Sequence, residues 1–432
     1  MELAAIYLFA PFVALLAIGV PIAFALAAAC LFFIAASGAP IPFAIVSTEL
    51  AAALDSYALL ALPTFIMTGE LLNRSGLTDR LVRLSMALVG WVRGGLAHVT
   101  TLTGMMLGSI SGSALADAAT LGPLMIPAME REKYPRPFAA AITGAASTIG
   151  AILPPSVPLI IIGSQLGLSI GALFLAGIIP GLLTGFALML VAWVTSKLRN
   201  YGIVHRFPGP LVALRTTGQA SPILLIPLII LGGIFSGVFT PTESGVVAVA
   251  YAMFVGLVYY RTLSLGGLLE AFRMTTRITA STLLIVAVSL VFGRLLTYMR
   301  VPQDLTAMIL SITENPILLF IIVVIFLMLM GTIMDAVANM IILGPLLMPL
   351  ALQGLGMEPV QYGLFLMYAL LLGVLTPPLG IVLFIVAPIA RVSIEELSLA
   401  TLPFLGAMLC VLTLIAFVPE VTMWLPRLAG YG

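Results

Sequence analysis

Long runs of apolar residues recur along this chain almost from end to end, and they restrict its fold more than any other feature. A helix needs roughly 20 such residues to cross a bilayer core of about 30 Å. Only 8% of the 432 residues are charged, against about 25% in an ordinary soluble domain. The sequence therefore predicts an all-α polytopic membrane protein with no soluble domain between its spans. The main runs lie at 3–18, 20–36, 56–73, 137–153, 170–196, 221–236, 241–260, 280–298, 361–375 and 397–418.

The longest polar connection, at 197–215, is basic and contains no acidic residue. The positive-inside rule places such a segment in the cytoplasm. It divides the chain near its middle, and we expect a basic cytoplasmic linker at about 201–220. The first apolar run lacks the basic start and cleavage site of a removable signal peptide, so we expect it to remain as a helix.

The two halves of the chain share short motifs at a nearly constant spacing. LGPLMIP at 121–127 returns as LGPLLMP at 343–349, an offset of 222 residues. The proline pair at 154–155 returns at 377–378, an offset of 223. Two further pairs lie at offsets of 224 and 220: Gly69 with Gly293, and Pro21 with Pro241.

Four collinear matches predict a duplicated unit, with repeat 1 at about 1–200 and repeat 2 at about 221–432. Secondary transporters are built from such repeats, and interrupted helices at matching positions point to their binding site. A single proline pair is equally consistent with a kink that adjusts helix packing. Because the pair occurs twice at matching positions, we interpret it as a functional break.

Each proline pair removes helical hydrogen bonds from an apolar segment. Proline has no N–H group, so the carbonyl four residues earlier loses its donor. In repeat 1 the first such carbonyl belongs to Gly150, and in repeat 2 to Gly373. Unpaired carbonyls are costly in hydrocarbon unless they line a polar cavity or hold an ion. The helix that restarts after a break points its N–H groups at the same place, which suits a carboxylate.

Each broken helix follows a segment that reads as a re-entrant hairpin. Residues 97–129 contain two apolar arms around the small polar cluster GSISGS at 108–113. Each arm of about 13–16 residues spans roughly 20–24 Å, too short to cross the bilayer core. We therefore predict hairpins at about 97–129 and 316–351, followed by broken helices at about 137–165 and 361–390.

The hairpin tips supply the hard oxygen ligands that alkali cations prefer. Three serines lie at the first tip, and a threonine, an aspartate and an asparagine lie in or just after the second. These candidates are Ser109, Ser111, Ser113, Thr332, Asp335 and Asn339.

Five ionisable residues in apolar surroundings have both a functional and a structural interpretation. Asp117 and Asp335 either belong to a binding site or brace the second arm of their hairpins. Glu243 follows a proline, and we interpret it as a partner for broken backbone there. Glu70 and Arg294 occupy matching repeat positions near helix ends. We interpret both as interfacial anchors, with Arg294 also kept as a candidate partner for a substrate carboxylate.

Several function classes are excluded or disfavoured. The two histidines are too far apart in the sequence for a metal site, and no HExxH, Walker or GxSxG motif is present. ATP-driven transport within this chain is therefore excluded, and we expect neither an enzyme nor a cofactor. A net charge of +1 gives no reason to expect nucleic-acid binding.

Five motifs resemble the large membrane subunit, or M subunit, of tripartite ATP-independent periplasmic (TRAP) transporters, and the resemblance covers essentially the whole chain. They are GSISGSALADAATLGPLMIPAM, STIGAILPPSVPLIIIG, VFTPTESGVVAVAYA, GTIMDAVANMIILGPLLMPLA and LLGVLTPPLGIVLFIVA.

This resemblance implies an elevator-type fold of the ion-transporter superfamily, with two inverted repeats, about eleven transmembrane helices and two re-entrant hairpins. It implies a multi-pass protein of a bacterial or archaeal cytoplasmic (inner) membrane. The implied partners are a small four-helix membrane subunit and a periplasmic binding protein that delivers an organic acid anion, such as a C4-dicarboxylate or sialic acid. The implied coupling ion is sodium.

The resemblance also implies positions for the sites. The first sodium site maps near Ser113 and on the break from Gly150 to Pro154. The second maps on Gly331 and on the break at Gly373, Thr376 and the backbone of Leu379. The substrate is expected between the tips, in contact with Ser111, Ser156 and Thr332.

Two alternative functions remain open on the sequence. One is a stand-alone, cation-coupled dicarboxylate or citrate-type permease with the same fold. The other is a channel-like membrane protein without coupled transport. Proton coupling through Asp335 is also open.

Overall fold

All the regular secondary structure in the described part of the chain is helical. The computed structural model describes residues 2–38, 40–377 and 380–431, and no strand occurs in these ranges. The first half contains α1 Glu2–Ala17, α2 Ile22–Ala36, α3 Ala44–Leu54, η1 Tyr57–Leu60, α4 Ala61–Arg74, α5 Thr78–Val89, α6 Gly95–Ser111, α7 Ala114–Arg131, α8 Arg136–Thr148, η2 Ile149–Ala151, α9 Val157–Leu166 and α10 Ile170–Arg199. The second half contains α11 Pro210–Phe235, α12 Pro241–Phe254, η3 Val255–Tyr259, α13 Leu265–Tyr298, α14 Val301–Ile312, α15 Pro316–Ile333, α16 Ala336–Gly354, α17 Pro359–Gly373, α18 Ile381–Ala390, α19 Ile394–Phe417 and α20 Glu420–Leu428.

Seven of these helices are long and apolar enough to cross a membrane. The count rises to eight if α3 and the segment Tyr57–Arg74, which meet at an angle of 52°, form one bent span. The protein is therefore a multi-pass membrane protein. The expected number of about eleven spans also depends on shorter apolar helices, such as α1, α2 and α17, and stays a prediction.

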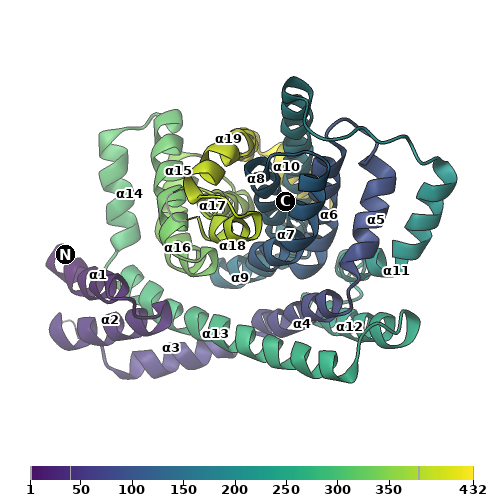
Figure 1. Cartoon of the computed structure of the whole chain (residues 1–432). Helices are drawn as coiled ribbons and strands as arrows, with labels where there is room; N and C mark the ends of the chain where they lie inside the picture. The colour runs from purple at the N-terminus through teal and green to yellow at the C-terminus, as the bar shows by residue number, and fades with distance from the viewer. Residues whose placement is uncertain (1, 39, 378–379, 432) are drawn as a thin grey trace.

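The helices form a central bundle and a surrounding frame (Figure 1). The bundle contains α6–α10 from the first half of the chain and α15–α19 from the second. α13 runs along one side of this bundle, next to α4 and α12, with α1–α3 at one end of the row. α5 and α11 lie on one side of the bundle, and α14 lies on the other.

α8 and α17 form the centre of the bundle. Every residue from Phe138 to Thr148 in α8 and from Gln361 to Gly373 in α17 is buried. α8 is rich in alanine, glycine, serine and threonine, and such small residues let helix backbones approach closely in membranes. α17 instead carries large apolar side chains around its whole circumference, as expected of a helix that is buried on all sides.

The connection between the two halves is shorter than the linker expected at 201–220. Residues 201–209 are not helical, but α11 begins at Pro210. Proline is favoured in the first turn of a helix, because its fixed φ suits the helix and no N–H bond is lost there. The second half of the expected linker is therefore the first part of α11. The division into repeats 1–200 and 221–432 stays a prediction.

Candidate transport site

Two pairs of antiparallel helices are each joined by only two residues. Gly112 and Ser113 join α6 to α7, and Met334 and Asp335 join α15 to α16. Gly112 has a left-handed backbone with φ of +61°, which glycine adopts without steric cost. The arms contain 17 and 18 residues in the first pair, and 18 and 19 in the second. The arms of the first pair are thus longer than the 13–16 residues expected, and both arms of the second pair are long and apolar enough to cross a membrane. A re-entrant course for either hairpin stays a prediction.

The second arm of each pair begins with a side-chain cap. The Ser113 hydroxyl accepts a hydrogen bond from the backbone N–H of Ala116 (3.4 Å). Asp335 accepts one from the N–H of Val337 through Oδ2 (3.0 Å). Both side chains thereby satisfy one of the free N–H groups at a helix N-terminus. Two predicted ligand residues, Ser113 and Asp335, therefore hold the tips in shape.

The two proline pairs interrupt helices where the sequence predicts. α8 and η2 end at Ala151, and α9 begins at Val157 after the break that contains Pro154. α17 ends at Gly373, and α18 begins at Ile381. The predicted ligand Leu379 lies outside the described residues.

The carbonyls at these breaks are better satisfied than the sequence suggests. The Gly373 carbonyl accepts a hydrogen bond from the N–H of Thr376 (2.9 Å), and the Val374 carbonyl accepts one from Val382 (3.2 Å). In repeat 1 the Ser156 hydroxyl donates to the Ala151 carbonyl (2.5 Å). The expectation that all these oxygens are free is therefore wrong, because the chain folds back after each break and offers new donors. Each carbonyl still has a second lone pair that can bind an ion.

Two glycines meet at the first break. A Cβ atom built on Gly108 would clash with Gly150, whose backbone nitrogen would lie 2.7 Å away. A Cβ on Gly150 would in turn clash with Gly108 and with Oδ2 of Asp117. Asp117 is fully buried, and Oδ1 accepts a hydrogen bond from the Ser111 hydroxyl (2.5 Å). Its Oδ2 is buried and has no hydrogen-bond partner among the described residues.

The second break repeats this arrangement with a different side chain. A Cβ on Gly373 would lie 2.6 Å from the Cα of Gly331. Asn339 lies in the first turn of α16, just as Asp117 lies in the first turn of α7. It donates from Nδ2 to the carbonyls of Met330 (2.8 Å) and Met334 (3.2 Å). Its Oδ1 is buried, and no described residue donates to it. Each break therefore combines a contact between two glycines with a buried side-chain oxygen that receives no hydrogen bond from the described residues.

A cavity of about 230 Å³ lies between the two tips and the frame helices. The second arms of both hairpins begin at it, and the first break, α17, α4 and α13 complete its wall. Its lining includes Ser111–Ala116, Ala151, Val157, Pro158, Asp335–Val337, Leu371 and Val374, together with Ile66, Gly69, Glu70 and Asn73 of α4, and Ile278 and Thr282 of α13.

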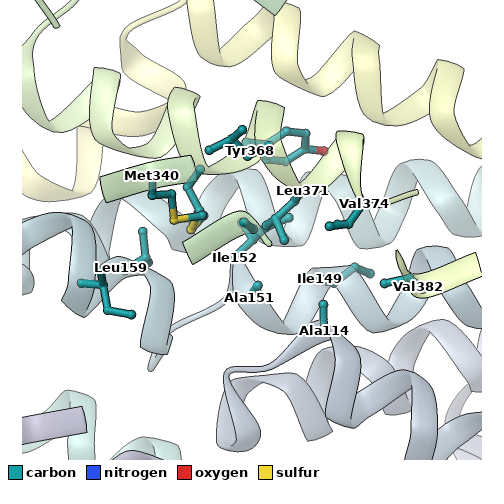
Figure 2. Packing of buried hydrophobic residues seen from close by; sticks show 14 of the residues in the cluster. Ala114, Ile149, Ala151, Ile152, Leu159, Met340, Tyr368, Leu371, Val374 and Val382 are labelled. Carbon is teal, nitrogen blue, oxygen red and sulfur yellow. The ribbon is translucent and has the colours of Figure 1, made fainter. Parts of the chain in front are cut away.

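The apolar part of this wall is formed where the two breaks pack together. Figure 2 shows Ile149, Ala151 and Ile152 of the first break facing Leu371 and Val374 at the end of α17. Ala151, Leu371 and Val374 are also cavity residues. Residues from both halves of the chain therefore line one cavity.

Of the predicted site residues, Ser111, Ser113 and Asp335 line this cavity. Gly150 belongs to the first glycine contact beside it, and Gly331 and Gly373 form the second. Asn339 lies next to the second contact, where it bonds to the carbonyl of Met330. Three hydroxyl groups instead bond to carbonyls of the preceding helical turn: Ser109 to Met106 (2.8 Å), Thr332 to Leu329 (2.7 Å) and Thr376 to Leu372 (2.7 Å).

Arg294 lies elsewhere, so the structure does not support it as a substrate contact. Its guanidinium group pairs with Glu49 of α3 at 3.3 Å, and 64% of its side chain is exposed. It is not among the described residues that line the cavity. The matching repeat positions of Arg294 and Glu70 do not predict these ion pairs. Glu70 pairs with Arg74 (3.2 Å), and Arg294 pairs with Glu49.

The wall formed by α4 is not predicted from the sequence. Glu70 is predicted to be an interfacial anchor and no prediction concerns Asn73, yet both line the cavity. Asn73 Oδ1 is buried without a partner among the described residues. The only sequence signal was their spacing of three residues, which places both on one face of a helix.

Comparison with known proteins agrees with this geometry. The family model described as "Tripartite ATP-independent periplasmic transporter, DctM component" matches residues 9–421. The sialic acid TRAP transporter large permease protein SiaM of Vibrio cholerae is 39% identical over 97% of both chains. The 2,3-diketo-L-gulonate TRAP transporter large permease protein YiaN of Escherichia coli is 34% identical over 94% of this chain and 95% of its own. The C4-dicarboxylate protein DctM of V. cholerae is 32% identical over 98% and 97%.

Two solved structures share the fold. The YdaH transporter of Alcanivorax borkumensis superposes with a TM-score of 0.59 at 18% identity, over 89% of both chains. MtrF of Neisseria gonorrhoeae superposes with a TM-score of 0.54 at 13% identity, over 86% of this chain and 83% of its own. The predicted fold class, an all-α polytopic membrane protein, is confirmed. The chain belongs to the DctM family of large TRAP transporter permeases, which are membrane transport proteins and not enzymes.

Proposed function

We propose that this permease carries out sodium-coupled secondary uptake of an organic acid anion across a bacterial or archaeal inner membrane. A periplasmic binding protein delivers the anion, and a small four-helix membrane subunit completes the transporter. The family match favours this tripartite assembly over a stand-alone permease. Three relatives are named as transporters of sialic acid, a C4-dicarboxylate and diketogulonate, which are carboxylates, and one is named for isethionate, a sulfonate. All four names refer to small organic anions.

The observation that carries the proposal is the duplicated arrangement beside the cavity. At each break two glycines meet, and a buried side-chain oxygen of Asp117 or Asn339 lacks a donor among the described residues. Buried acceptors are normally satisfied, and a cation with oxygen ligands satisfies them as well as a hydrogen bond does. The possible ligands at the two breaks are oxygen atoms of carbonyls, hydroxyls, a carboxylate and an amide. Oxygen ligands of this kind fit sodium. Bound sodium would supply positive charge next to the cavity.

The anion is held, in this proposal, by the N-terminus of α7. Residues Ala114–Ala116 line the cavity, and the first N–H groups of a helix favour an anion at that end. The N-terminus of α16 already has an anionic partner, because the carboxylate of Asp335 accepts a hydrogen bond from the N–H of Val337. The bundle that contains both hairpins and both breaks then moves as a transport core against the frame of α4 and α13. No covalent step is required, so coupling consists of binding and movement alone.

Sodium binding can be tested without knowledge of the substrate. The purified permease, co-expressed with its small subunit, is unfolded by heat in sodium chloride and in an equal concentration of potassium chloride. A ligand at one hundred times its Kd stabilises the folded state by about 2.7 kcal/mol, so sodium is expected to raise the unfolding midpoint selectively. Ser113→Ala and Gly373→Val should remove this effect. Equal midpoints in the two salts would overturn sodium coupling.

A further inference from the structure

Residues 201–209, here called the connector, lead from α10 in the bundle to α11 beside it (Figure 1). The start of the connector is fixed to the bundle. The ring of Tyr201 meets that of Phe138 in α8 edge-on, with 5.4 Å between the ring centroids. Gly202 lies so close to the phenol of Tyr134 that a Cβ atom there would clash with it.

The middle of the connector is held by an ion pair. Nε2 of His205 lies 2.7 Å from Oε1 of Glu132, and 36% and 17% of the two side chains are exposed. Glu132 caps the C-terminus of α7, so the pair joins the connector to the base of the first hairpin. Oε2 of Glu132 is buried and receives no hydrogen bond from the described part of the chain.

The next contact belongs to a helix outside the bundle. The ring of Phe207 packs edge-on against Trp91, with 5.4 Å between the centroids. Trp91 follows the end of α5, and its indole N–H donates to the carbonyl of Leu88 in that helix (2.9 Å). The connector therefore contacts the bundle at His205 and the end of α5 at Phe207, only two residues further on.

These two contacts limit how far the end of α5 can separate from the bundle. The two residues from His205 to Phe207 reach at most about 7 Å when fully extended. Without the contact at His205, the next fixed point on the bundle is Gly202, and the reach to Phe207 becomes about 18 Å. Whether His205 is held therefore decides how much the joint between α5 and the bundle can open.

The strength of the contact depends on the proton of His205. A neutral imidazole can donate one hydrogen bond to Glu132, whereas a protonated one adds a positive charge opposite the carboxylate. The C-terminal end of the α7 dipole favours the same positive charge. Histidine is the side chain that ordinarily changes charge between pH 5 and 8, so acid strengthens this contact and alkali weakens it.

The other charged and titratable groups of the surrounding elements do not replace this pair. Tyr134 stays neutral, because burial raises its pKa. Arg131, Lys133 and Arg206 are exposed and form no ion pair within the described ranges. The remaining groups have their own partners: Arg93 with Asn200 (2.5 Å), His98 with the carbonyl of Arg93 (3.1 Å), Arg136 with Glu130 (2.5 Å), Lys197 with the ring of Trp193 (4.9 Å) and Arg199 with Tyr201 (3.5 Å).

We infer that the connector is a pH-dependent clip between the bundle and the end of α5. Protonation of His205 fastens the clip to Glu132, and loss of the proton releases it. Because this basic segment is predicted to lie in the cytoplasm, acid in the cytoplasm restrains the bundle and slows transport. The inference rests on the proposed movement of the bundle against the surrounding helices.

The clip is tested by a distance measurement that needs no substrate. Spin labels are placed on α5 and on α19 of the bundle through Arg83→Cys and Leu399→Cys, both exposed positions, in a Cys410→Ser background because Cys410 is exposed and Cys30 is buried. Electron–electron resonance is recorded on the permease with its small subunit in lipid nanodiscs, at about pH 5.5 and pH 8 in equal sodium. The ratio of released to clipped molecules should rise about two- to fivefold at the higher pH, the effect of a partly exposed ion pair.

Variants with a fixed charge assign the effect to this pair. His205→Lys stays charged and should give the pattern of the low pH at both values. His205→Gln and Glu132→Gln remove one charge and should give the pattern of the high pH at both values. Arg206→Gln, an exposed neighbour, is the matched control and should respond to pH as the wild type does.

The outcomes separate the clip from the movement on which it rests. Distances that vary but do not respond to pH in the wild type, or a pH response that persists in His205→Gln or Glu132→Gln, overturn the clip and leave the movement intact. One narrow distance in every variant, including His205→Gln at pH 8, overturns the clip together with the proposed movement. Sodium-selective thermal stabilisation is measured on the same samples and tests sodium binding independently of both.

Discussion

The hydroxyl of Ser111 donates a hydrogen bond of 2.5 Å to Oδ1 of Asp117, and the second oxygen of that carboxylate lies against the contact between Gly108 and Gly150. The corresponding place in the second half of the chain is occupied by Asn339, 222 residues later. The two breaks therefore share a backbone arrangement but differ in this side chain, which is a carboxyl group at the first break and an amide at the second. An ionised Asp117 gives a nearby cation a Coulomb partner that Asn339 cannot give.

Asp117→Asn removes this charge and keeps the size of the side chain. A hydrogen bond to a charged group contributes about 1.5–3 kcal/mol. A sodium–carboxylate contact of that order predicts that its loss raises the sodium concentration for half-maximal uptake at least about tenfold. Uptake into proteoliposomes at several sodium concentrations measures this. Asn315→Asp, at the exposed start of α15, serves as a control for changed surface charge. An unaltered sodium dependence in Asp117→Asn would show that the carboxylate only braces the hairpin.

The glycine contact at the second break should tolerate no side chain. In Gly373→Ala the new Cβ would lie 2.6 Å from both the Cα of Gly331 and the carbonyl oxygen of Met328. Overpacking of this kind costs typically about 1–3 kcal/mol, and here it also separates the hairpin from the broken helix. Thermal unfolding should shift down and sodium-driven uptake should be lost.

The matched control for this change is Gly406→Ala in α19, where nothing lies within 4 Å of the added atom. Gly406→Ala should leave uptake unchanged and slightly raise stability, because alanine is the better helix former. Normal uptake by Gly373→Ala would remove the glycine contact from the mechanism.

The sequence predicts the hairpins and breaks because each leaves a local signal. A proline pair cannot remain inside a regular helix, and the cluster at 108–113 is too polar and too small to continue an apolar arm. Repetition at a nearly fixed offset then pairs the two breaks, and the proline rule selects Gly373 in the second, whereas Gly331 is implied only by the resemblance to the TRAP family. These features depend on neighbours within a few residues, which is the range that a single sequence reveals.

The rest of the site depends on contacts between distant segments. Nothing near Asn73 in the sequence indicates that α4 packs against a tip some forty residues later. The proline rule shows that the Gly373 carbonyl loses its helical donor, but not that Thr376 replaces it. Likewise the repeat offset pairs Arg294 with Glu70, yet it predicts neither ion pair: Glu70 pairs with Arg74 of its own helix, and Arg294 pairs with Glu49 of α3.

A buried glutamine joins the second broken helix to α19. Nε2 of Gln361 donates to the carbonyls of Ile415 (2.9 Å) and Ala416 (3.2 Å), and its Oε1 accepts from the N–H of Glu358 (3.1 Å). Gln361→Leu leaves these groups without partners, and each buried unsatisfied group costs about 1–3 kcal/mol. The midpoint of thermal unfolding should therefore fall clearly, while Gln353→Leu should stay within about 0.5 kcal/mol of the wild type, as most exposed substitutions do. Equal midpoints for the two variants would contradict this role.

The closest approach of the frame to the first tip offers a test of movement separate from binding. A Cβ on Gly69 of α4 would lie 3.1 Å from the Cα of Ser111, so a larger side chain there would press against the tip. If the bundle slides past α4 during transport, Gly69→Val should abolish uptake but retain selective stabilisation by sodium, since the glycine contacts at both breaks are untouched. Gly232→Val in α11, where the added Cβ meets nothing within 4 Å, should transport normally. Loss of sodium stabilisation together with uptake in Gly69→Val would instead show that the substitution distorts the tip itself, and normal uptake would exclude movement at this contact.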